Sequence, residues 1–336
     1  MSSSARLAAV LAGIVAALAA ATATAAPLKL RIQHAGAVPG MFGNLLEGIT
    51  EHYRRYGKSY IIESIAIRGS GAALTALAAR EVEIAAIAYE GLTHAVVTAK
   101  LDVRVIADVL AAGVHGHLAA PFVVRKGDIK SVAELKGKVV STPTRGSTAD
   151  TAIRIIAGRH GLKDGVDYRV VEVAFPAMLP ALDSKRIDLA YVVPPWHVIA
   201  ERSGKHETLF TMFDAVGPIQ SLVWVAHADF IAKNRAALVD FMEDHIRFRR
   251  WILDPANRAA ALQATIRVTK QPLELIEPWA YSKRDHYRAP DARPDLALLQ
   301  KNIDMAKEYG AAPDRFDLVP KYVDMTLIDD ALRRLN

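Results

Sequence analysis

The sequence predicts an α/β fold made of two lobes of similar design, and three observations lead to that prediction. Strand-like and helix-like segments alternate over most of the chain, which is typical of sheets flanked by helices. Two stretches of sequence recur further along the chain, which indicates an internal repeat. The chain is 336 residues long, more than a single hydrophobic core usually organises, so two lobes are favoured over one.

The first 25 residues have the pattern of a secretory signal peptide. Arg6 and a short polar start precede an apolar run over 7–21, and small residues then lead to Ala25. That order is typical of export signals, and the run is shorter than the roughly 20 residues of a membrane-spanning helix. We therefore expect export and cleavage near Ala25, with a retained membrane anchor as the alternative.

Composition narrows the class of protein further. The chain has 0 Cys, so neither a disulfide nor a lipid-modified cysteine is available, and a soluble mature protein is expected. The formal net charge is +6, which suits a receptor for anions. Basic residues are spread along the chain without a dense block, which argues against nucleic acid as a partner.

The strand-like segments alternate in polarity or are uniformly apolar, as half-buried and buried strands do. In chain order they are 28–33, 60–67, 82–88, 103–110, 122–125, 139–142, 168–173, 187–193 and 222–225. The helix-like segments carry apolar residues at three- and four-residue spacing. In chain order they are 44–56, 72–80, 148–159, 176–183 and 196–202, followed by a mostly helical tail from 234.

No low-complexity linker divides the chain, so we expect the lobes to be joined by two short crossing strands. The apolar runs 122–125 and 222–225 are the candidates, because both flank the middle block of the sequence. The expected division is a signal peptide over 1–25, a first lobe over 27–120, a second lobe over 121–223, and a return to the first lobe with a helical tail over 224–336.

The internal repeat consists of two pairs of segments. Arg68-Gly69-Ser70-Gly71 resembles Arg145-Gly146-Ser147-Thr148, and each follows a predicted strand and opens a predicted helix. Residues 74–85 match residues 179–190 in apolar, basic and acidic type at most positions, without a gap. Because ligands of open α/β sheets bind beyond the carboxyl ends of the strands, these loops are expected to converge in one cleft.

The Arg-Gly-Ser loops have the chemistry of an anion site. Glycine lets the backbone approach a ligand, and the first N–H groups of a helix lack internal partners and lie at the positive end of its dipole. Ser147 or Thr148 adds a hydroxyl, and Arg145 adds a planar fork for acidic oxygens. The alternative is ordinary capping, with Ser147 as cap and Asp150 three residues later.

Other loops at strand ends supply further candidates. Tyr89 and Trp196 offer rings that could stack on an organic ligand, although Tyr89 suits core packing equally well. His34 is equally explained as a hydrogen-bonding loop residue. The full set of expected ligand-binding residues is Gln33, His34, Pro39, Ser70, Gly71, Tyr89, Glu90, Arg145, Gly146, Ser147, Thr148, Pro195 and Trp196, with Asn44 as a weaker candidate.

Catalytic and cofactor motifs are missing from the sequence. It contains no Gly-x-Ser-x-Gly, no complete Gly-x-x-x-x-Gly-Lys-Ser/Thr phosphate loop, since Gly57-Lys58-Ser59 lacks the earlier glycine, and no His-Glu-x-x-His, so we expect no enzyme and no cofactor. His115 and His117 would share one face of a strand and are a weak metal hypothesis. Arg247, Arg249 and Arg250 are expected to form a solvated helix face.

Several segments together resemble the periplasmic solute-binding proteins of ABC transporters in the sulfonate, taurine and nitrate group, which is related to binders of thiamine-pyrimidine precursors. The segments are 131–140, which reads SVAELKGKVV, Gly146-Ser147-Thr148, and Ile187-Asp188-Leu189-Ala190 leading to Pro195-Trp196. The resemblance covers about 28–253 and weakens in the helical tail. The segment 131–140 is common to bacterial solute receptors and does not specify a substrate.

The resemblance implies a type II periplasmic-receptor fold that closes on its ligand by hinge motion. It also implies a monomer that captures a small anionic solute and delivers it to a membrane permease. Glu90 departs from this expectation, because a sulfonate receptor has little use for a carboxylate in its cleft; a ligand with an amine, or a pyrimidine-like heterocycle, would fit it. The alternatives are a pyrimidine-precursor binder or enzyme, and a sensory binding module.

Overall fold

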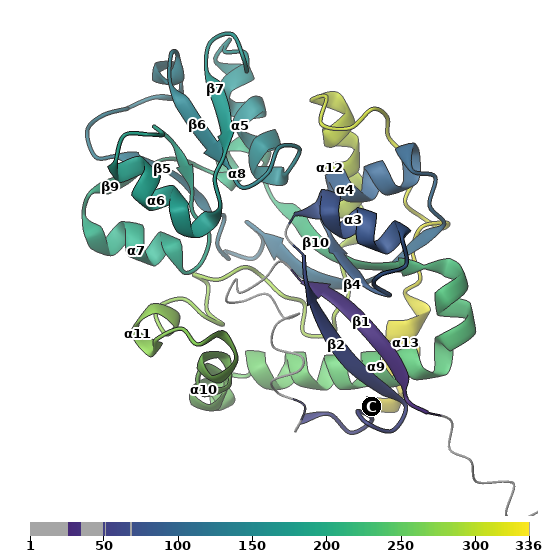
Figure 1. Cartoon of the computed structure of the whole chain (residues 1–336). Coiled ribbons are helices and arrows are strands. Elements are labelled where there is room, and N and C mark those ends of the chain that lie inside the picture. Colours follow the sequence, from purple (N-terminus) through teal and green to yellow (C-terminus); the bar gives the residue numbers. More distant parts are fainter. Residues whose placement is uncertain (1–25, 35–49, 51, 68, 336) are drawn as a thin grey trace, which may run out of the picture.

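The computed structural model describes residues 26–34, 50, 52–67 and 69–335. The expected signal peptide and the candidates Pro39, Asn44 and Arg68 lie outside the described residues, as does most of the predicted helix over 44–56. None of the helices in the described ranges is both long enough and apolar enough to span a bilayer. The described chain forms two α/β lobes lying side by side (Figure 1), which confirms the predicted fold class.

The sheet of lobe 1 has the order β2-β1-β3-β10-β4. Strand β1 pairs in parallel with β2, and β10 pairs antiparallel with both β3 and β4. A parallel bridge between Ile32 and Ile84 joins the two halves of this sheet. The strands are β1 (Leu28–His34), β2 (Tyr60–Ala66), β3 (Ala85–Ile87), β4 (Val103–Ala112) and β10 (Ile219–His227).

The sheet of lobe 2 repeats this order as β7-β6-β8-β5-β9. Strands β6 and β7 are parallel, and β5 pairs antiparallel with β8 and β9. A parallel bridge between Val140 and Leu189 joins the halves. The strands are β5 (Pro121–Arg125), β6 (Val139–Thr142), β7 (Arg169–Glu172), β8 (Ala190–Tyr191) and β9 (His206–Thr211). Strand β8 is shorter than the predicted 187–193.

The helices flank these sheets largely where the sequence predicts them. The predicted helices 72–80, 148–159, 176–183 and 196–202 correspond to α3 (Ser70–Ala78), α5 (Thr148–Arg159), α6 (Phe175–Asp183) and α7 (Trp196–Ser203). The other helices are α4 (Tyr89–Thr93), α8 (Met212–Val216), α9 (Ala228–Leu253), α10 (Arg258–Thr269), α11 (Leu273–Ile276), α12 (Leu296–Glu308) and α13 (Thr326–Leu335). Short helical segments cover His94–Thr98, Val132–Leu135 and Pro255–Asn257.

The longer of the two sequence repeats is confirmed by backbone geometry. Arg80 and Lys185 occupy matching positions of the repeat, and both have a positive φ, of 57° and 59°. The N–H of Arg80 donates to Leu77 O at 3.0 Å, and the N–H of Lys185 donates to Leu182 O at 3.1 Å. The units β2-α3-β3 and β7-α6-β8 are therefore structural equivalents.

The match between the two Arg-Gly-Ser loops is not structural. The loop at Gly69 follows β2 and opens α3, whereas the loop at Gly146 follows β6 and opens α5. Because β6 corresponds to β1 and not to β2, the two loops occupy different places in their lobes. The prediction that they form matched halves of a clamp is therefore wrong, although the two-lobed design that it supported is correct.

The predicted crossing strands lie inside the lobes instead of between them. Strand β5 belongs to the sheet of lobe 2 and β10 to the sheet of lobe 1. The chain crosses just before each of them, over 113–120 and 212–218. The two crossings touch at Gly113 (φ 69°), where an added Cβ would lie 2.9 Å from Phe213 Cδ2 and 3.6 Å from Pro218 Cα. Glycine is needed there because φ is positive and because a side chain would collide with the other crossing.

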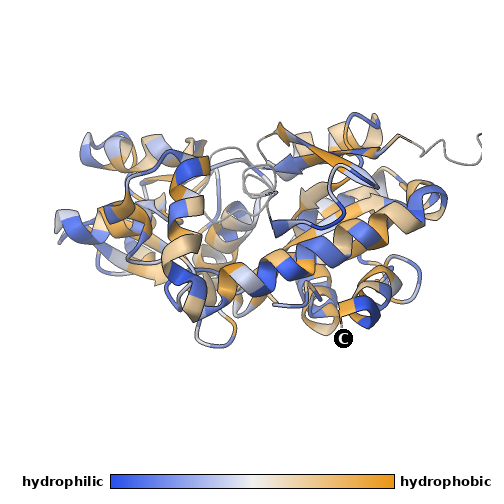
Figure 2. Ribbon diagram, turned by 90° about the horizontal axis from the view of Figure 1, so that it is seen from below, coloured by the Kyte–Doolittle hydropathy of each residue, from blue (hydrophilic) through white to orange (hydrophobic). Residues whose placement is uncertain are grey.

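The tail from residue 228 returns to lobe 1 and covers its sheet. Helices α9 and α13 pack on each other and on the lobe 1 strands. Polar and apolar residues alternate around the long helix seen from below in Figure 2, as expected of a helix with one buried face. Helices α10 and α11 instead reach lobe 2, where Ile276 and Trp279 pack with Val198 of α7.

Candidate functional site

The two lobes meet where the starts of α3 and α4 in lobe 1 face the start of α5 in lobe 2. The Thr148 hydroxyl donates to Glu90 Oε2 at 3.1 Å across this contact. A Cβ placed on Gly69 would lie 3.3 Å from Thr144 Oγ1. These positions follow β2, β3 and β6, so the carboxyl ends of strands from both lobes converge as the sequence predicts. We call this region the interlobe site.

Glu90 is the most unusual residue of the interlobe site. Its side chain is buried, with 1 % of the residue exposed, and its Oε1 atom has no hydrogen-bond partner. Burial raises the pKa of the Glu90 carboxyl from 4.5 to about 7, and its own backbone and the neighbouring hydroxyls of Tyr89, Thr148 and Thr151 offset this rise only in part. Glu90 therefore titrates near neutral pH.

A ring of hydroxyl groups surrounds this carboxylate. Tyr89 is fully buried, and its hydroxyl has no hydrogen-bond partner. The same holds for the hydroxyl of Thr151, which is 2 % exposed. Tyr191 interacts electrostatically with Tyr89, and burial raises the pKa of the Tyr191 hydroxyl. Buried polar atoms without partners are uncommon in folded proteins and mark places where a ligand or water binds.

Sequence reasoning finds Tyr89, Glu90 and Thr148 but misses Thr151 and Tyr191. Thr151 lies one turn after Ser147 and three residues after Thr148 on α5, so helical spacing places it on the same side as those residues. That spacing is the signal that could have identified it. Tyr191 ends a two-residue strand, and the sequence gives no comparable sign of its position.

The start of α5 is occupied by the chain's own groups. Ser147 Oγ accepts a hydrogen bond from Asp150 N at 3.4 Å, and the carboxylate of Asp150 accepts one from Gly146 N at 2.9 Å. Ser147 is therefore a helix cap, as the alternative interpretation holds. Arg145 is engaged as well, because its guanidinium pairs with Asp164 of its own lobe. These contacts leave little of the expected anion anchor at Arg145, Gly146 and Ser147.

The start of α3 is less occupied. Its cap position, Gly69, makes no side-chain capping bond, and the first turn contains no acidic residue. A Cβ on Gly71 would meet nothing within 4 Å, so there is space beside this turn. Ser70 Oγ accepts from Ala88 N at 3.3 Å, which leaves its hydroxyl proton available. The helix N–H groups of α3 are thus better placed to bind an anion than those of α5.

The remaining candidates have mainly structural contacts. Gln33 is 2 % exposed, and its amide donates to Ile67 O at 2.6 Å and accepts from Ala86 N at 2.9 Å, which ties β1 to both neighbouring strands. Trp196 stacks on Phe175 at 5.6 Å between ring centroids. His34 ends β1 and is half-buried, and Pro195 is buried directly before α7. The structure places these four residues around the strand ends without bringing them into the ring at Glu90.

The metal hypothesis for His115 and His117 requires that both lie on one strand, and the structure does not place them on a strand. Both residues lie in a turn between β4 and β5, where Gly113, His115 and Gly116 have positive φ. Their rings pack against Tyr287, with centroids 4.7 and 5.3 Å away. In the part of the chain that the structure describes, no group of three His, Cys, Asp or Glu residues is arranged to hold a metal ion.

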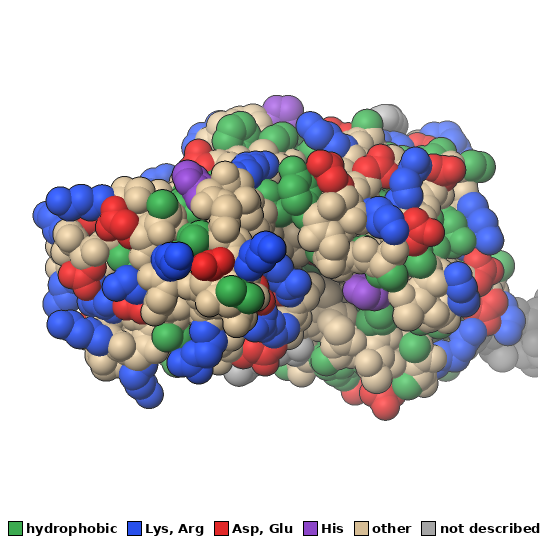
Figure 3. All heavy atoms as spheres, turned by 90° about the horizontal axis from the view of Figure 1, so that it is seen from above, with side chains coloured by type: hydrophobic (Ala, Val, Ile, Leu, Met, Phe, Trp, Pro, Cys, Tyr) green, Lys and Arg blue, Asp and Glu red, His purple; other side chains and the backbone are tan. Residues whose placement is uncertain are grey.

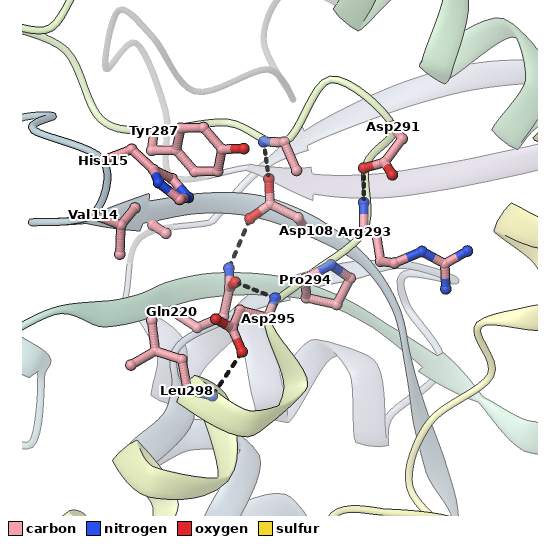
Figure 4. Close-up of a pocket in the computed structure, with 12 residues that line it drawn as sticks. Asp108, Val114, His115, Gln220, Tyr287, Asp291, Arg293, Pro294, Asp295 and Leu298 are labelled. Carbon is pink, nitrogen blue, oxygen red and sulfur yellow. Dashed lines mark hydrogen bonds between the residues drawn. The ribbon is translucent and has the colours of Figure 1, made fainter.

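Arg249 is not on a solvated face as predicted but fully buried in lobe 1. Its guanidinium pairs with the Asp108 carboxylate and donates to Ala289 O at 2.8 Å. Asp108 also accepts from Gln220 Nε2 at 2.7 Å, and Gln220 Oε1 accepts from Asp295 N at 3.0 Å. Figure 4 shows the part of this network formed by Asp108, Gln220 and Asp295, which line a pocket of about 240 Å³. The buried polar groups of this network pair and hydrogen-bond with one another, so the network is structural.

One face of the molecule carries mixed charge. Figure 3 shows Lys and Arg side chains interspersed with Asp and Glu over both lobes. This distribution agrees with the spread of basic residues along the sequence and differs from the continuous basic surface of nucleic-acid-binding proteins.

Comparison with known families assigns the chain to one of them. A profile of the NMT1-like family matches residues 47–266, which is more than half of the chain. The chain belongs to the NMT1-like family. The match contains both sequence repeats and the interlobe site of this NMT1-like protein. Sulfonate- and nitrate-binding proteins are among its solved structural neighbours, in agreement with the resemblance seen in the sequence. No curated protein matches the chain.

Solved structures confirm the fold of this NMT1-like chain. The nitrate-binding protein NrtA from Synechocystis PCC 6803 has a TM-score of 0.70 and 15% identity, covering 93% of this chain and 89% of its own. The alkanesulfonate-binding protein SsuA from Xanthomonas axonopodis pv. citri, bound to MOPS, has a TM-score of 0.66 and 16% identity, covering 88% and 98%. Both neighbours are binding proteins, and at this identity the likeness concerns the fold.

An enzyme shares the same fold. The desulfurization enzyme DSZB has a TM-score of 0.63 and 13% identity, covering 92% of this chain and 100% of its own. At this identity the likeness concerns the fold alone, so it transfers no reaction to the NMT1-like chain. With 0 Cys in its sequence, the chain has no thiol nucleophile to offer.

Proposed function

We propose that the chain is the solute-binding component of an ABC importer, which captures a small organic solute with an acidic group between its lobes and delivers it to a membrane permease. The observation that carries the proposal is the interlobe site, where both lobes contribute buried polar groups without partners, above all Glu90, Tyr89 and Thr151. Family membership and the names of the sulfonate- and nitrate-binding neighbours support it.

The acidic group of the solute belongs at the start of α3 in this proposal. The uncapped first turn at Ser70 and Gly71 supports that placement, together with the space beside Gly71. The net charge of +6 favours the approach of an anion. Thr148 then completes the site from lobe 2.

The proposal includes the expected location and lobe boundaries. The protein acts in the periplasm after cleavage near Ala25, as a monomer, with lobes over 27–120 and 121–223 and a return over 224–336. The crossings at 113–120 and 212–218 support these limits to within about ten residues. A binder of pyrimidine precursors is the second candidate, because Glu90 could accept hydrogen bonds from the amino group of a heterocycle.

A panel of solutes tests the proposal. We expect the purified mature protein to gain thermal stability with at least one of taurine, ethanesulfonate, nitrate, aromatic carboxylates and aminopyrimidines. A ligand at 100 times its Kd stabilises the native state by about 2.7 kcal/mol, which is a readily measured shift in Tm. A shift with aminopyrimidines alone would favour the second candidate. No shift with any anion at millimolar concentration would contradict the proposal.

A further inference from the structure

The C-terminal tail makes a second contact between the lobes, on α7 of lobe 2. Between α9 and α12, which belong to lobe 1, the tail leaves that lobe, and its helices α10 and α11 lie beside α7 (Figure 1). Arg202 of α7 donates to Glu274 O at 2.8 Å, and Glu201 of α7 pairs with Arg284. We call this region the tail contact. Its apolar residues are Val198 of α7 and Leu262, Ile276, Trp279 and Ala280 of the tail.

The same part of the tail is bound to the first crossing, over 113–120. Asp285 O accepts a hydrogen bond from Leu118 N at 3.1 Å, just after the tail contact in the chain. Tyr287 and Ala111 exchange both of their backbone hydrogen bonds, at 2.9 and 2.8 Å. Because the tail is held at the crossing, a rotation of lobe 2 about that crossing separates α7 from the tail.

A histidine without hydrogen bonds lies inside the tail contact. His197 of α7 is 2 % exposed, and neither of its ring nitrogens has a hydrogen-bond partner. Its ring meets the ring of Trp279 edge-on, with 6.3 Å between the centroids. A neutral imidazole leaves one N–H donor unpaired there, whereas an imidazolium would leave two donors and a charge without compensation.

The charged groups around His197 do not offset its burial. Burial lowers the pKa of the His197 imidazole from 6.5 to about 4, and it lowers the pKa of the nearby His286 imidazole to about 4 as well. Between these values an exposed histidine binds a proton that the closed contact excludes, so the contact loses stability as pH falls. The titratable and charged groups that face this pair are Glu201 on α7, Arg284, Asp285 and Arg288 of the tail, and His117 of the first crossing.

We propose that the tail contact is an acid-sensitive latch, in which protonation of His197 separates α7 from the tail and allows lobe 2 to move away from lobe 1. At neutral pH the imidazole is uncharged, and its apolar contact with Trp279 holds the two lobes together. In mild acid the imidazolium leaves the contact, because water satisfies both of its donors. Release of a captured solute in acid would follow from the latch and rests on the proposed function; the latch itself does not.

A single thiol measures the opening of the tail contact. The chain has 0 Cys, so Val198→Cys in the mature protein supplies one thiol, at a position that is 2 % exposed. Its rate of reaction with dithiodipyridine is divided by the rate for the unfolded variant at the same pH, which removes the effect of thiol ionisation. We expect this ratio to rise about tenfold or more between about pH 7.5 and pH 5, since His197 gains its proton only when the contact opens.

Two further variants in the Val198→Cys background tie this rise to His197. In His197→Phe the rise should be at least about threefold smaller than in the parent protein. In His160→Gln, which removes an exposed histidine, the rise should persist in full. Circular dichroism checks that each variant folds; should His197→Phe fail to fold, His197→Gln, which does not titrate, takes its place.

A thiol elsewhere in lobe 2 separates opening of the contact from unfolding. Val124 is fully buried in a different apolar cluster, so Val124→Cys should stay protected at both pH values. Equal rises at Val124→Cys and Val198→Cys would mean that acid unfolds lobe 2, and they would overturn the inference. No rise at Val198→Cys, or an undiminished rise in His197→Phe, would overturn it as well. None of these results bears on the solute panel, so the proposed function would stand.

Discussion

Replacing Arg249 with methionine is expected to lower the free energy of unfolding by about 3–5 kcal/mol. The Arg249 guanidinium is fully buried and pairs with Asp108, which is 1 % exposed. Removing the cation leaves a buried carboxylate without its charge partner, and the carbonyls of Asp108 and Ala289 lose their donors. Urea unfolding followed by circular dichroism measures the effect.

Two further variants identify the cause of that loss. Arg250→Met changes the exposed neighbour on the same helix and is expected to alter the free energy of unfolding by less than about 0.5 kcal/mol. Combining Arg249→Met with Asp108→Asn should recover part of the loss, because the buried charge is then removed together with its partner. A loss below 1 kcal/mol for Arg249→Met would show that the buried pair contributes little.

The second large effect concerns the pH dependence of stability at the interlobe site. The pKa of Glu90 rises from 4.5 to about 7 on folding, so between these values the folded protein binds a proton that the unfolded chain has lost. The free energy of unfolding therefore decreases as pH rises from about 4.5 to 7, by about 3 kcal/mol for this group. In Glu90→Gln this contribution is absent.

The comparison is best made as a difference between proteins, because other groups titrate in both. We subtract the free energy of unfolding of wild type from that of Glu90→Gln. This difference should be about 3 kcal/mol larger at pH 8 than at pH 5. Glu308→Gln, at an exposed position, should track wild type across this range. A difference between Glu90→Gln and wild type that stays constant from pH 5 to pH 8 would mean that Glu90 titrates normally.

Most of the fold can be predicted from the sequence, because the spacing of apolar residues and the residues that begin and end each element are local properties. Helix α5 begins and ends where its apolar spacing predicts, at Thr148 and Arg159. The repeat of 74–85 in 179–190 is preserved because a helix end, a turn with positive φ at Arg80 or Lys185, and a buried strand must all be encoded together. Agreement over so many constraints separates a structural repeat from a chance match.

Features that depend on distant partners were predicted less well. The Arg-Gly-Ser match failed because four residues encode a turn before a helix without specifying which strand precedes it. Arg249 was assigned to a solvated face because its partner Asp108 lies 141 residues away in the chain. The crossings were misplaced by a few residues because an apolar run such as Pro121–Arg125 reads the same in a sheet and between lobes.

In the candidate site, too, local sequence predicts some features, whereas features that depend on distant partners are not predicted. The sequence places Tyr89, Glu90 and Thr148 near one another because they follow strands, and strand ends gather at one edge of a sheet. Arg145 was expected to bind the ligand, but its own lobe supplies the acid Asp164. Only the folded structure shows which polar groups already have partners. Because the groups at the start of α5 have partners, we place the anion at α3 instead of α5.

The most direct test of closure on a solute is a covalent lock between the lobes. The chain has 0 Cys, and a Cβ on Gly69 would lie 3.9 Å from Thr144 Cβ, which matches the separation found in disulfides. The variant with Gly69→Cys and Thr144→Cys is loaded with the solute identified by the panel, oxidised and dialysed, and the solute retained is measured by mass spectrometry. A cysteine at the positive φ of Gly69 is strained by about 1–3 kcal/mol, so Gly69→Cys alone, which has the same strain and no disulfide partner, serves as the control.

We expect the oxidised double variant to retain its solute through dialysis and to release it when dithiothreitol is added, whereas the control releases it under both conditions. Retention would mean that the solute leaves only when the two lobes separate at Gly69 and Thr144. Equal release from the oxidised and the reduced double variant, or no disulfide at all, would contradict a receptor that closes its lobes on a solute at this site.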